Sequence, residues 1–126
     1  MTFTPQNCLV WAEIPVTDMD ASIAFYQTVT GGTLNYSEDG PNPMASFQTG
    51  DGSNGVALHL YPGKPAGDGS GPTLHLATEG KLEGVMDRVS KAGGNVLYGP
   101  IAIPAGRFFY ATDPDGNSIG FFETAS

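Results

Sequence analysis

The most constraining feature of this sequence is an internal duplication of its element pattern. Gly-Gly pairs at 31–32 and 93–94 each end a segment with helical apolar spacing, and the second pair lies 62 residues after the first. The same shift aligns the strand-like segments around each helix, and a shift of 63 aligns the last strands of the two halves. Because the order of the elements and the positions of the glycine pairs agree between the two halves, we predict two βαβββ modules.

Apolar periodicity locates the elements of each module. Met19, Ile23 and Tyr26 recur at helical spacing after Thr17 or Asp18, either of which can cap a helix. Residues 81–92 carry the same kind of stripe in the second half. Strands are predicted at 8–16, 33–37, 44–49, 56–61, 73–77, 95–98 and 107–112, with a last strand after the turn at 113–117.

The predicted organisation is a single domain, 1–126, made of the two modules. Module one covers about 8–61, and residues 62–72, which lack periodicity and bulky apolar side chains, form a linker to module two at about 73–124. A four-stranded sheet with one helix leaves its other face bare. We therefore predict an α+β fold in which the modules form one open eight-stranded cup, with the helices outside and a cavity within.

Composition excludes several functional classes. Thirteen acidic against five basic residues give a net charge of −8, which disfavours binding to nucleic acid or to an anionic membrane surface. Cys8 is the only cysteine, so no intrachain disulfide can form. The N-terminus has no signal-peptide pattern, and no window approaches 18 apolar residues. We expect a cytoplasmic protein.

Four segments together resemble the vicinal oxygen chelate superfamily, which contains glyoxalase I, bleomycin resistance proteins and extradiol dioxygenases. They are Val10–Asp18 (VWAEIPVTD), Ile23–Tyr26 (IAFY), Ala92–Val96 (AGGNV) and Asp113–Asn117 (DPDGN). The resemblance covers roughly 9–123 and implies paired βαβββ modules and a homodimer. In metal-dependent members, it implies one divalent ion held by four inward side chains from the first and last strands of the modules.

The resemblance places those four ligand positions at Trp11, Thr73, Gly120 and, within a residue, Ala57. These side chains do not form a metal site. No cofactor is therefore expected at the usual positions. Ordinary glyoxalase I chemistry, which needs the ion to stabilise an enediolate, is not supported.

Strand alternation suggests other candidate site residues. If Trp11 and Thr73 point into the cavity, Glu13 and His75 do too, and by the same parity His59 and Phe122 join them. One hypothesis is a displaced metal site formed by Glu13, His59 and His75, which would make a divalent metal the cofactor. The alternative is a metal-free Glu13–His75 pair acting as a general base with its orienting partner. A register slip of one residue would separate these side chains.

Other residues are candidates for binding a ligand rather than for catalysis. Trp11 and Phe122, with Phe47 and Phe109, could stack on a flat ligand or could simply belong to the core. Arg107, before the seventh strand, could clamp a carboxylate or phosphate, although an exposed or interface arginine is the simpler interpretation.

Two functional classes stay open. One is a glyoxalase- or dioxygenase-like enzyme, a lyase, isomerase or oxidoreductase, acting on a small oxygenated metabolite through Glu13 and His75, with Trp11, His59, Thr73, Arg107 and Phe122 binding the substrate. The other is a metal-free protein that binds or sequesters a small molecule, as the resemblance to bleomycin resistance proteins implies.

Overall fold

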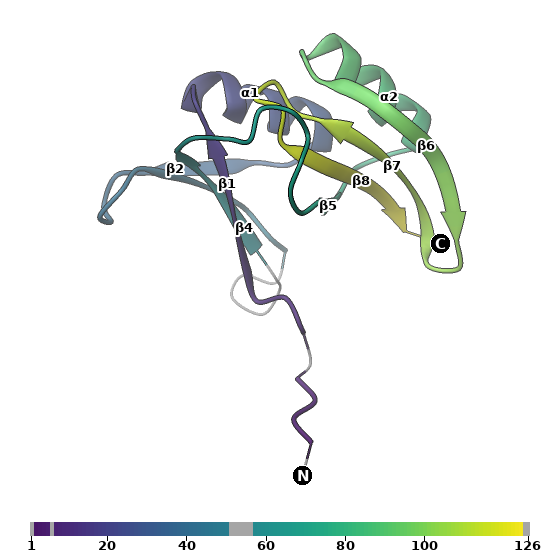
Figure 1. Cartoon of the computed structure of the whole chain (residues 1–126), viewed down its shortest axis with the longest axis horizontal. Coiled ribbons are helices and arrows are strands. Elements are labelled where there is room, and N and C mark those ends of the chain that lie inside the picture. Colours follow the sequence, from purple (N-terminus) through teal and green to yellow (C-terminus); the bar gives the residue numbers. More distant parts are fainter. Residues whose placement is uncertain (1, 6, 51–56, 125–126) are drawn as a thin grey trace.

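The computed structural model describes residues 2–5, 7–50 and 57–124 (Figure 1). The elements are β1 (Trp11–Val16), α1 (Met19–Thr30), β2 (Leu34–Ser37), β3 (Met44–Phe47), β4 (Ala57–Pro62), β5 (Leu74–Ala77), α2 (Leu82–Lys91), β6 (Asn95–Ile103), β7 (Gly106–Thr112) and β8 (Ser118–Thr124). This order is two successive βαβββ modules, as predicted. The first strand begins later than predicted, and β6 runs further. The glycine-rich sequence at 50–55 also predicts a turn between the third and fourth strands. Residues 51–55 of this turn and the predicted strand start at 56 lie outside the described residues.

Each module forms one four-stranded sheet whose first strand is an edge strand. The strand orders are β1-β4-β3-β2 and β5-β8-β7-β6. β1 pairs in parallel with β4, and β5 pairs in parallel with β8, whereas the other neighbours are antiparallel. Both sheets stay open, and both helices lie on their outer side (Figure 1). The predicted α+β cup is confirmed. No helix in the described part of the chain has the length and apolarity needed to cross a membrane.

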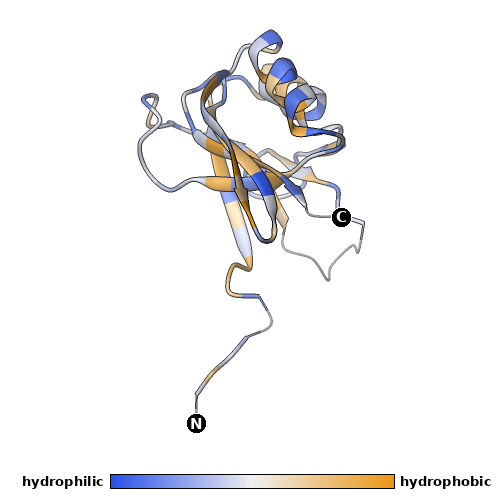
Figure 2. Ribbon diagram, turned by 90° about the vertical axis from the view of Figure 1, so that its right-hand side faces the viewer, coloured by the Kyte–Doolittle hydropathy of each residue, from blue (hydrophilic) through white to orange (hydrophobic). Residues whose placement is uncertain are grey.

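Alternation along the strands divides each sheet into a core face and a face turned away from the helices, called the concave face below. Ile14 and Val16 of β1 are buried in one cluster with Phe25 of α1, whereas Trp11 is 48% exposed. In β8 the buried aromatic side chain is Phe121. In Figure 2 the strands are largely orange, and the helix at the top carries hydrophilic turns. The concave faces are therefore the ones that the two helices do not cover (Figure 1).

The turn at 113–117 joins the two modules. The Tyr26 hydroxyl donates to Asp113 Oδ2 at 2.6 Å, and Asp113 Oδ1 also accepts from the backbone N–H groups of Asp115 and Asn117, both at 2.9 Å. The Asn117 side chain then donates to the Pro15 carbonyl of module one at 2.8 Å. Burial, together with the neighbouring Asp113 carboxylate, raises the pKa of Tyr26 well above its usual value. The hydroxyl therefore stays protonated and can act as a donor.

A second junction lies between the helices. Arg88 of α2 donates from Nε and Nη2 to the Val29 carbonyl at the end of α1, at 3.3 and 3.1 Å. The Glu79 N–H donates to the Thr30 carbonyl at 3.0 Å. The last carbonyls of a helix have no partner within it, so module two supplies donors that module one needs.

Candidate functional site

The concave face of module one carries a histidine–carboxylate pair. In the parallel pairing of β1 with β4, Glu13 lies opposite His59, and Glu13 Oε1 is 3.3 Å from His59 Nε2. The Trp11 ring packs at 5.1 Å from the imidazole ring. The histidine side chain is buried, while the carboxylate is 60% exposed. Strand pairing within one sheet thus brings Glu13 together with His59, and the alternative pairing of Glu13 with His75 of the other sheet stays a prediction.

His59 has one ring nitrogen without a partner. Nε2 faces the Glu13 carboxylate, whereas Nδ1 is buried and makes no hydrogen bond to any described residue. A proton on Nε2 satisfies the carboxylate and leaves Nδ1 as an acceptor. Leaving a buried polar group unpaired costs about 1–3 kcal/mol. A ligand or a bound water molecule that donates a hydrogen bond to Nδ1 would remove this cost.

The concave face of module two carries an aromatic wall, which we define as His75, Phe108, Tyr110 and Phe122. The His75 ring lies 5.1 Å from that of Phe108 and 5.8 Å from that of Tyr110, both edge-on. Phe108 and Phe122 stack with an interplanar angle of 5° at 6.2 Å. Partial burial lowers the pKa of His75, so its imidazole is neutral at pH 7.

Gly120 makes this wall continuous. It lies in β8 between His75 of β5 and Tyr110 of β7. Side chains two strands apart are separated by about 10 Å of backbone spacing, so they touch only if one leans across the strand between them. A Cβ atom at position 120 would collide with the His75 ring. The glycine therefore leaves the space that the imidazole fills, at the position where the resemblance places a metal-binding carboxylate.

The predicted displaced metal site is not assembled. Glu13 and His59 belong to one sheet and His75 to the other. No three His, Cys, Asp or Glu side chains are grouped to hold a metal ion within the described ranges. At the usual positions, the Thr73 hydroxyl is already hydrogen-bonded to the Ser118 hydroxyl. The donor set does not fit a divalent ion, because of these three side chains the described structure brings only Glu13 and His59 into contact.

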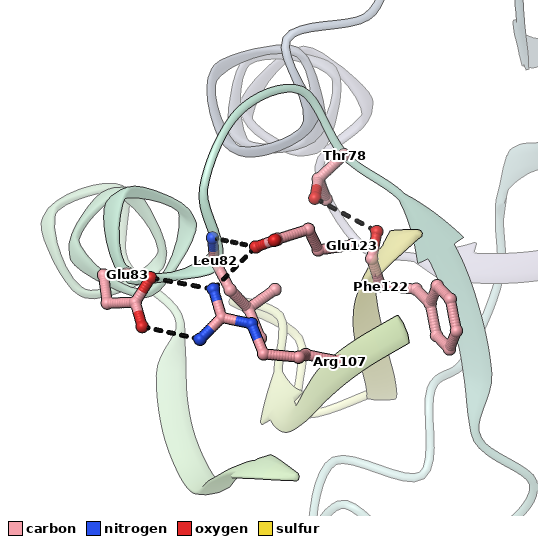
Figure 3. A network of polar contacts seen from close by, with 6 residues as sticks. All are labelled: Thr78, Leu82, Glu83, Arg107, Phe122 and Glu123. Atoms are coloured by element: carbon pink, nitrogen blue, oxygen red, sulfur yellow. Dashed lines mark hydrogen bonds and ion pairs between the residues drawn. The ribbon is translucent and has the colours of Figure 1, made fainter. Parts of the chain in front are cut away.

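Arg107 lies away from the concave face. Its guanidinium contacts Glu83 Oε2 of α2 at 2.8 Å and Glu123 Oε1 at 2.7 Å, and Glu123 Oε1 also accepts from the Leu82 N–H at 2.7 Å (Figure 3). Hydrogen bonding to Arg107 lowers the pKa of Glu83 to about 2. The predicted ligand clamp is thus corrected to a tie between the sheet and the start of α2. The reason is that residues two apart on a strand point to the same side of the sheet, so Arg107 lies on the same side of β7 as the buried Phe109.

Of the aromatic residues predicted to stack on a ligand, Phe109 belongs to the core, whereas Phe47 packs against the core and also lines the larger of the two cavities described below. Phe109 is fully buried and packs against Phe121 at 5.5 Å. Phe47 packs edge-on against Tyr26 of α1 at 5.7 Å. Sequence analysis missed their neighbours Phe108 and Tyr110. The signal was present, because both alternate with Phe109 along the predicted strand.

Two cavities lie where β1 and β5, the inner edge strands of the two sheets, approach each other. The larger has a volume of about 780 Å³, and its lining includes Thr73 and His75. The smaller, about 400 Å³, is lined in part by Trp11 and Glu13. His59 and Phe122 line neither cavity. The concave-face residues Trp11, Glu13 and His75 thus each border one of these cavities.

Comparison with known proteins agrees with this geometry. The family model for the Glyoxalase/Bleomycin resistance protein/Dioxygenase superfamily matches residues 9–121, and the chain belongs to that superfamily.

Among curated relatives, CFP32 of Mycobacterium bovis, a glyoxylase by name, is 29% identical over 119 residues, covering 90% of this chain and 44% of that protein. The chain thus spans less than half the length of this relative. Among solved structures, a glyoxalase/bleomycin resistance protein from Streptomyces sp. CB03234 is 25% identical with a TM-score of 0.63, covering 91% of this chain and 99% of the other. TnmS3 from the same organism, described as an antibiotic binding protein, shares the fold at 24% identity and a TM-score of 0.64, covering 98% and 100%.

Proposed function

We propose that the protein binds a flat, unsaturated small molecule against the aromatic wall, without the four-ligand metal site of its family. The observation that carries this proposal is the continuous face made by His75, Phe108, Tyr110 and Phe122. It occupies the concave face, where a Cβ atom on Gly120 would collide with the His75 ring. The family resemblance would place a metal-binding carboxylate at this position.

The chemistry of the wall supports a flat ligand. Aromatic rings gain about 0.5–1.5 kcal/mol per pair beyond the area they bury when they stack or meet edge-on. A neutral imidazole adds one donor and one acceptor at the margin of the wall. TnmS3, a protein of the same fold, is an antibiotic binding protein by its description.

The site would be completed by a second copy of the chain. In one chain the two helices do not cover the concave faces (Figure 1), and a homodimer, which the family resemblance implies, would bring further protein surface over them. The cytoplasm is the expected location, where the exposed Cys8 thiol would stay reduced.

The only tryptophan of the chain, Trp11, is a natural reporter for this proposal, because it lies on the concave face of module one. We would titrate the protein with acridine and with perhydroanthracene, an uncharged saturated tricycle of the same size, following Trp11 fluorescence and binding heat. Acridine is expected to bind more tightly. Phe122→Leu should weaken acridine binding about 3- to 10-fold, the equivalent of losing one stacking contact.

The matched control is Phe3→Leu, the same change at a side chain that is 85% exposed on the N-terminal segment. It should leave acridine affinity unchanged. Equal binding of the aromatic and saturated compounds, or equal affinity of Phe122→Leu and the unaltered protein, would contradict the proposal.

Proton transfer at Glu13–His59 is a second candidate function. The Glu13 carboxylate is 60% exposed and is the group that a substrate can reach, and the buried His59 imidazole lies beside it with Nε2 3.3 Å from Oε1. This is the arrangement of a general base with its orienting group. The substrate would be a small oxygenated metabolite with an acidic C–H group, and the reaction that of a lyase or isomerase. The name of CFP32 agrees with such an activity.

NMR can follow the replacement of dihydroxyacetone C–H protons by deuterium from D₂O. This measurement tests for proton abstraction by the Glu13–His59 pair and needs no knowledge of the product. The protein should accelerate exchange, and Glu13→Gln should reduce the acceleration about 100-fold or more, since general base catalysis contributes about 10²–10⁴-fold. His75→Gln is the control and should retain it. Exchange no faster than in buffer would argue against this activity.

A further inference from the structure

The larger of the two cavities, called the seam cavity below, is separate from the aromatic wall. It lies between the core face of module one and strand β5 of module two. Its apolar lining includes Ala12 and Leu58 from the first sheet and Leu74 and Leu76 from β5. Phe108, Tyr110 and Phe122 do not line it, and His75 alone belongs to both. Its volume of about 780 Å³ lies in the range of small-molecule sites.

Among the described residues, the lining carries no Asp, Glu, Lys or Arg side chain, although the chain as a whole has a net charge of −8. A charged ligand would lose its hydration there and find no counter-ion, which is strongly unfavourable. His75, the histidine of the lining, has a lowered pKa from partial burial and is neutral. The seam cavity thus favours uncharged molecules.

Two polar side chains of the lining differ in whether they already make hydrogen bonds to described residues. The Thr30 hydroxyl donates to the Tyr26 carbonyl at 2.7 Å and accepts from the Gly32 N–H at 3.1 Å. The side-chain amide of Gln48, in contrast, makes no hydrogen bond to another described residue. An amide at the border of an apolar cavity offers both a donor and an acceptor to a ligand.

We propose that the seam cavity binds a neutral, largely apolar small molecule with one hydrogen-bonding group, of the class of long-chain alcohols and ketones. The apolar part contacts Ala12, Leu58, Leu74 and Leu76, and the polar group contacts the Gln48 amide. This site is independent of the flat ligand assigned to the aromatic wall, so either proposal can fail without the other.

The neutral fluorophore N-phenyl-1-naphthylamine can report on the seam cavity, and the variants described below decide whether it binds there or at the aromatic wall. Its fluorescence should rise saturably with the protein, and 1-dodecanol should displace it at least about 10-fold more effectively than dodecanoate or dodecyltrimethylammonium, because the lining cannot pair a charge. Absence of binding, or equal displacement by charged and neutral chains, would overturn the proposal.

Filling the cavity provides the matched comparison. Ala12→Phe places a ring in the lining and should weaken probe binding about 10-fold or more, whereas Ala102→Phe, the same change at an exposed position of β6, should leave it within about 2-fold. Phe122→Leu should also leave it unchanged. If Phe122→Leu weakens the probe and Ala12→Phe does not, the probe binds the aromatic wall and the proposal is wrong.

A measurement on the unaltered protein avoids any question of misfolding. Cys8 lines the seam cavity and is the only thiol in the chain. Saturating 1-dodecanol should slow the reaction of this thiol with 5,5′-dithiobis(2-nitrobenzoate) at least about 3-fold, because a ligand in the cavity restricts access to a lining residue. An unchanged rate at saturation would contradict the predicted position of the ligand.

Discussion

Replacing Gly120 with alanine tests whether the glycine exists to accommodate the His75 ring. The new Cβ atom would collide with this ring, so in the unaltered background Gly120→Ala should destabilise the protein. In a His75→Ala background the collision is gone. There the substitution should be neutral or stabilising, because glycine within a strand is less stable than alanine by about 0.5–1 kcal/mol.

The expected magnitude follows from how far the imidazole can move. Overpacking a filled site costs about 1–3 kcal/mol, and forcing a side chain off its rotamer costs about 0.5–1.5 kcal/mol. His75 packs against Phe108 and Tyr110 on one side but is exposed on the other, so part of the strain can relax. We expect a coupling free energy between the two substitutions of about 1–3 kcal/mol, within the range for residues in contact.

The assay is urea unfolding of the four proteins at pH 8, where the imidazole is neutral, followed by circular dichroism and by Trp11 fluorescence. In a separate thermal unfolding experiment, Gly120→Ala alone should lower the melting temperature by about 4 °C per kcal/mol lost. The matched control is Gly50→Ala, where a Cβ atom meets nothing within 4 Å. A coupling free energy below about 0.5 kcal/mol, the usual scatter for independent sites, would refute the steric explanation.

Three further predictions concern stability. Tyr26→Phe should lower the free energy of unfolding by about 1–3 kcal/mol in urea, because the buried Asp113 carboxylate loses a hydrogen bond of 2.6 Å, and an unchanged midpoint would contradict this. Arg107→Ala should be less stable than the unaltered protein at pH 7. The difference in free energy of unfolding between this variant and the unaltered protein should shrink as the pH falls from 4.5 towards 2, because Glu83 with its lowered pKa becomes protonated over this interval. A difference that does not change with pH would refute this explanation. His75→Gln should flatten the loss of stability below pH 6.5, because a histidine with a lowered native pKa favours unfolding when it takes up a proton, and parallel stability profiles would count against it.

Local patterns in the sequence determined the elements of the fold and the faces of its strands. Helical spacing, paired glycines and the 113–117 turn predicted two βαβββ modules, which the structure confirms. Alternation likewise places Phe121 in the core and Phe122 on the concave face. Such information is readable because neighbours two or four apart along the chain meet the same environment. Arg107 and Phe109 could have been assigned to the core face by the same rule.

Tertiary structure decided which side chains meet across strands. Parity allowed Glu13 to pair with either histidine, and the parallel register of β1 with β4 brings it beside His59. Similarly, Gly120 read as a missing ligand, and only its place between β5 and β7 gives it a role as the space for His75. Contacts between residues far apart in the chain depend on strand order and register, which no local pattern contains.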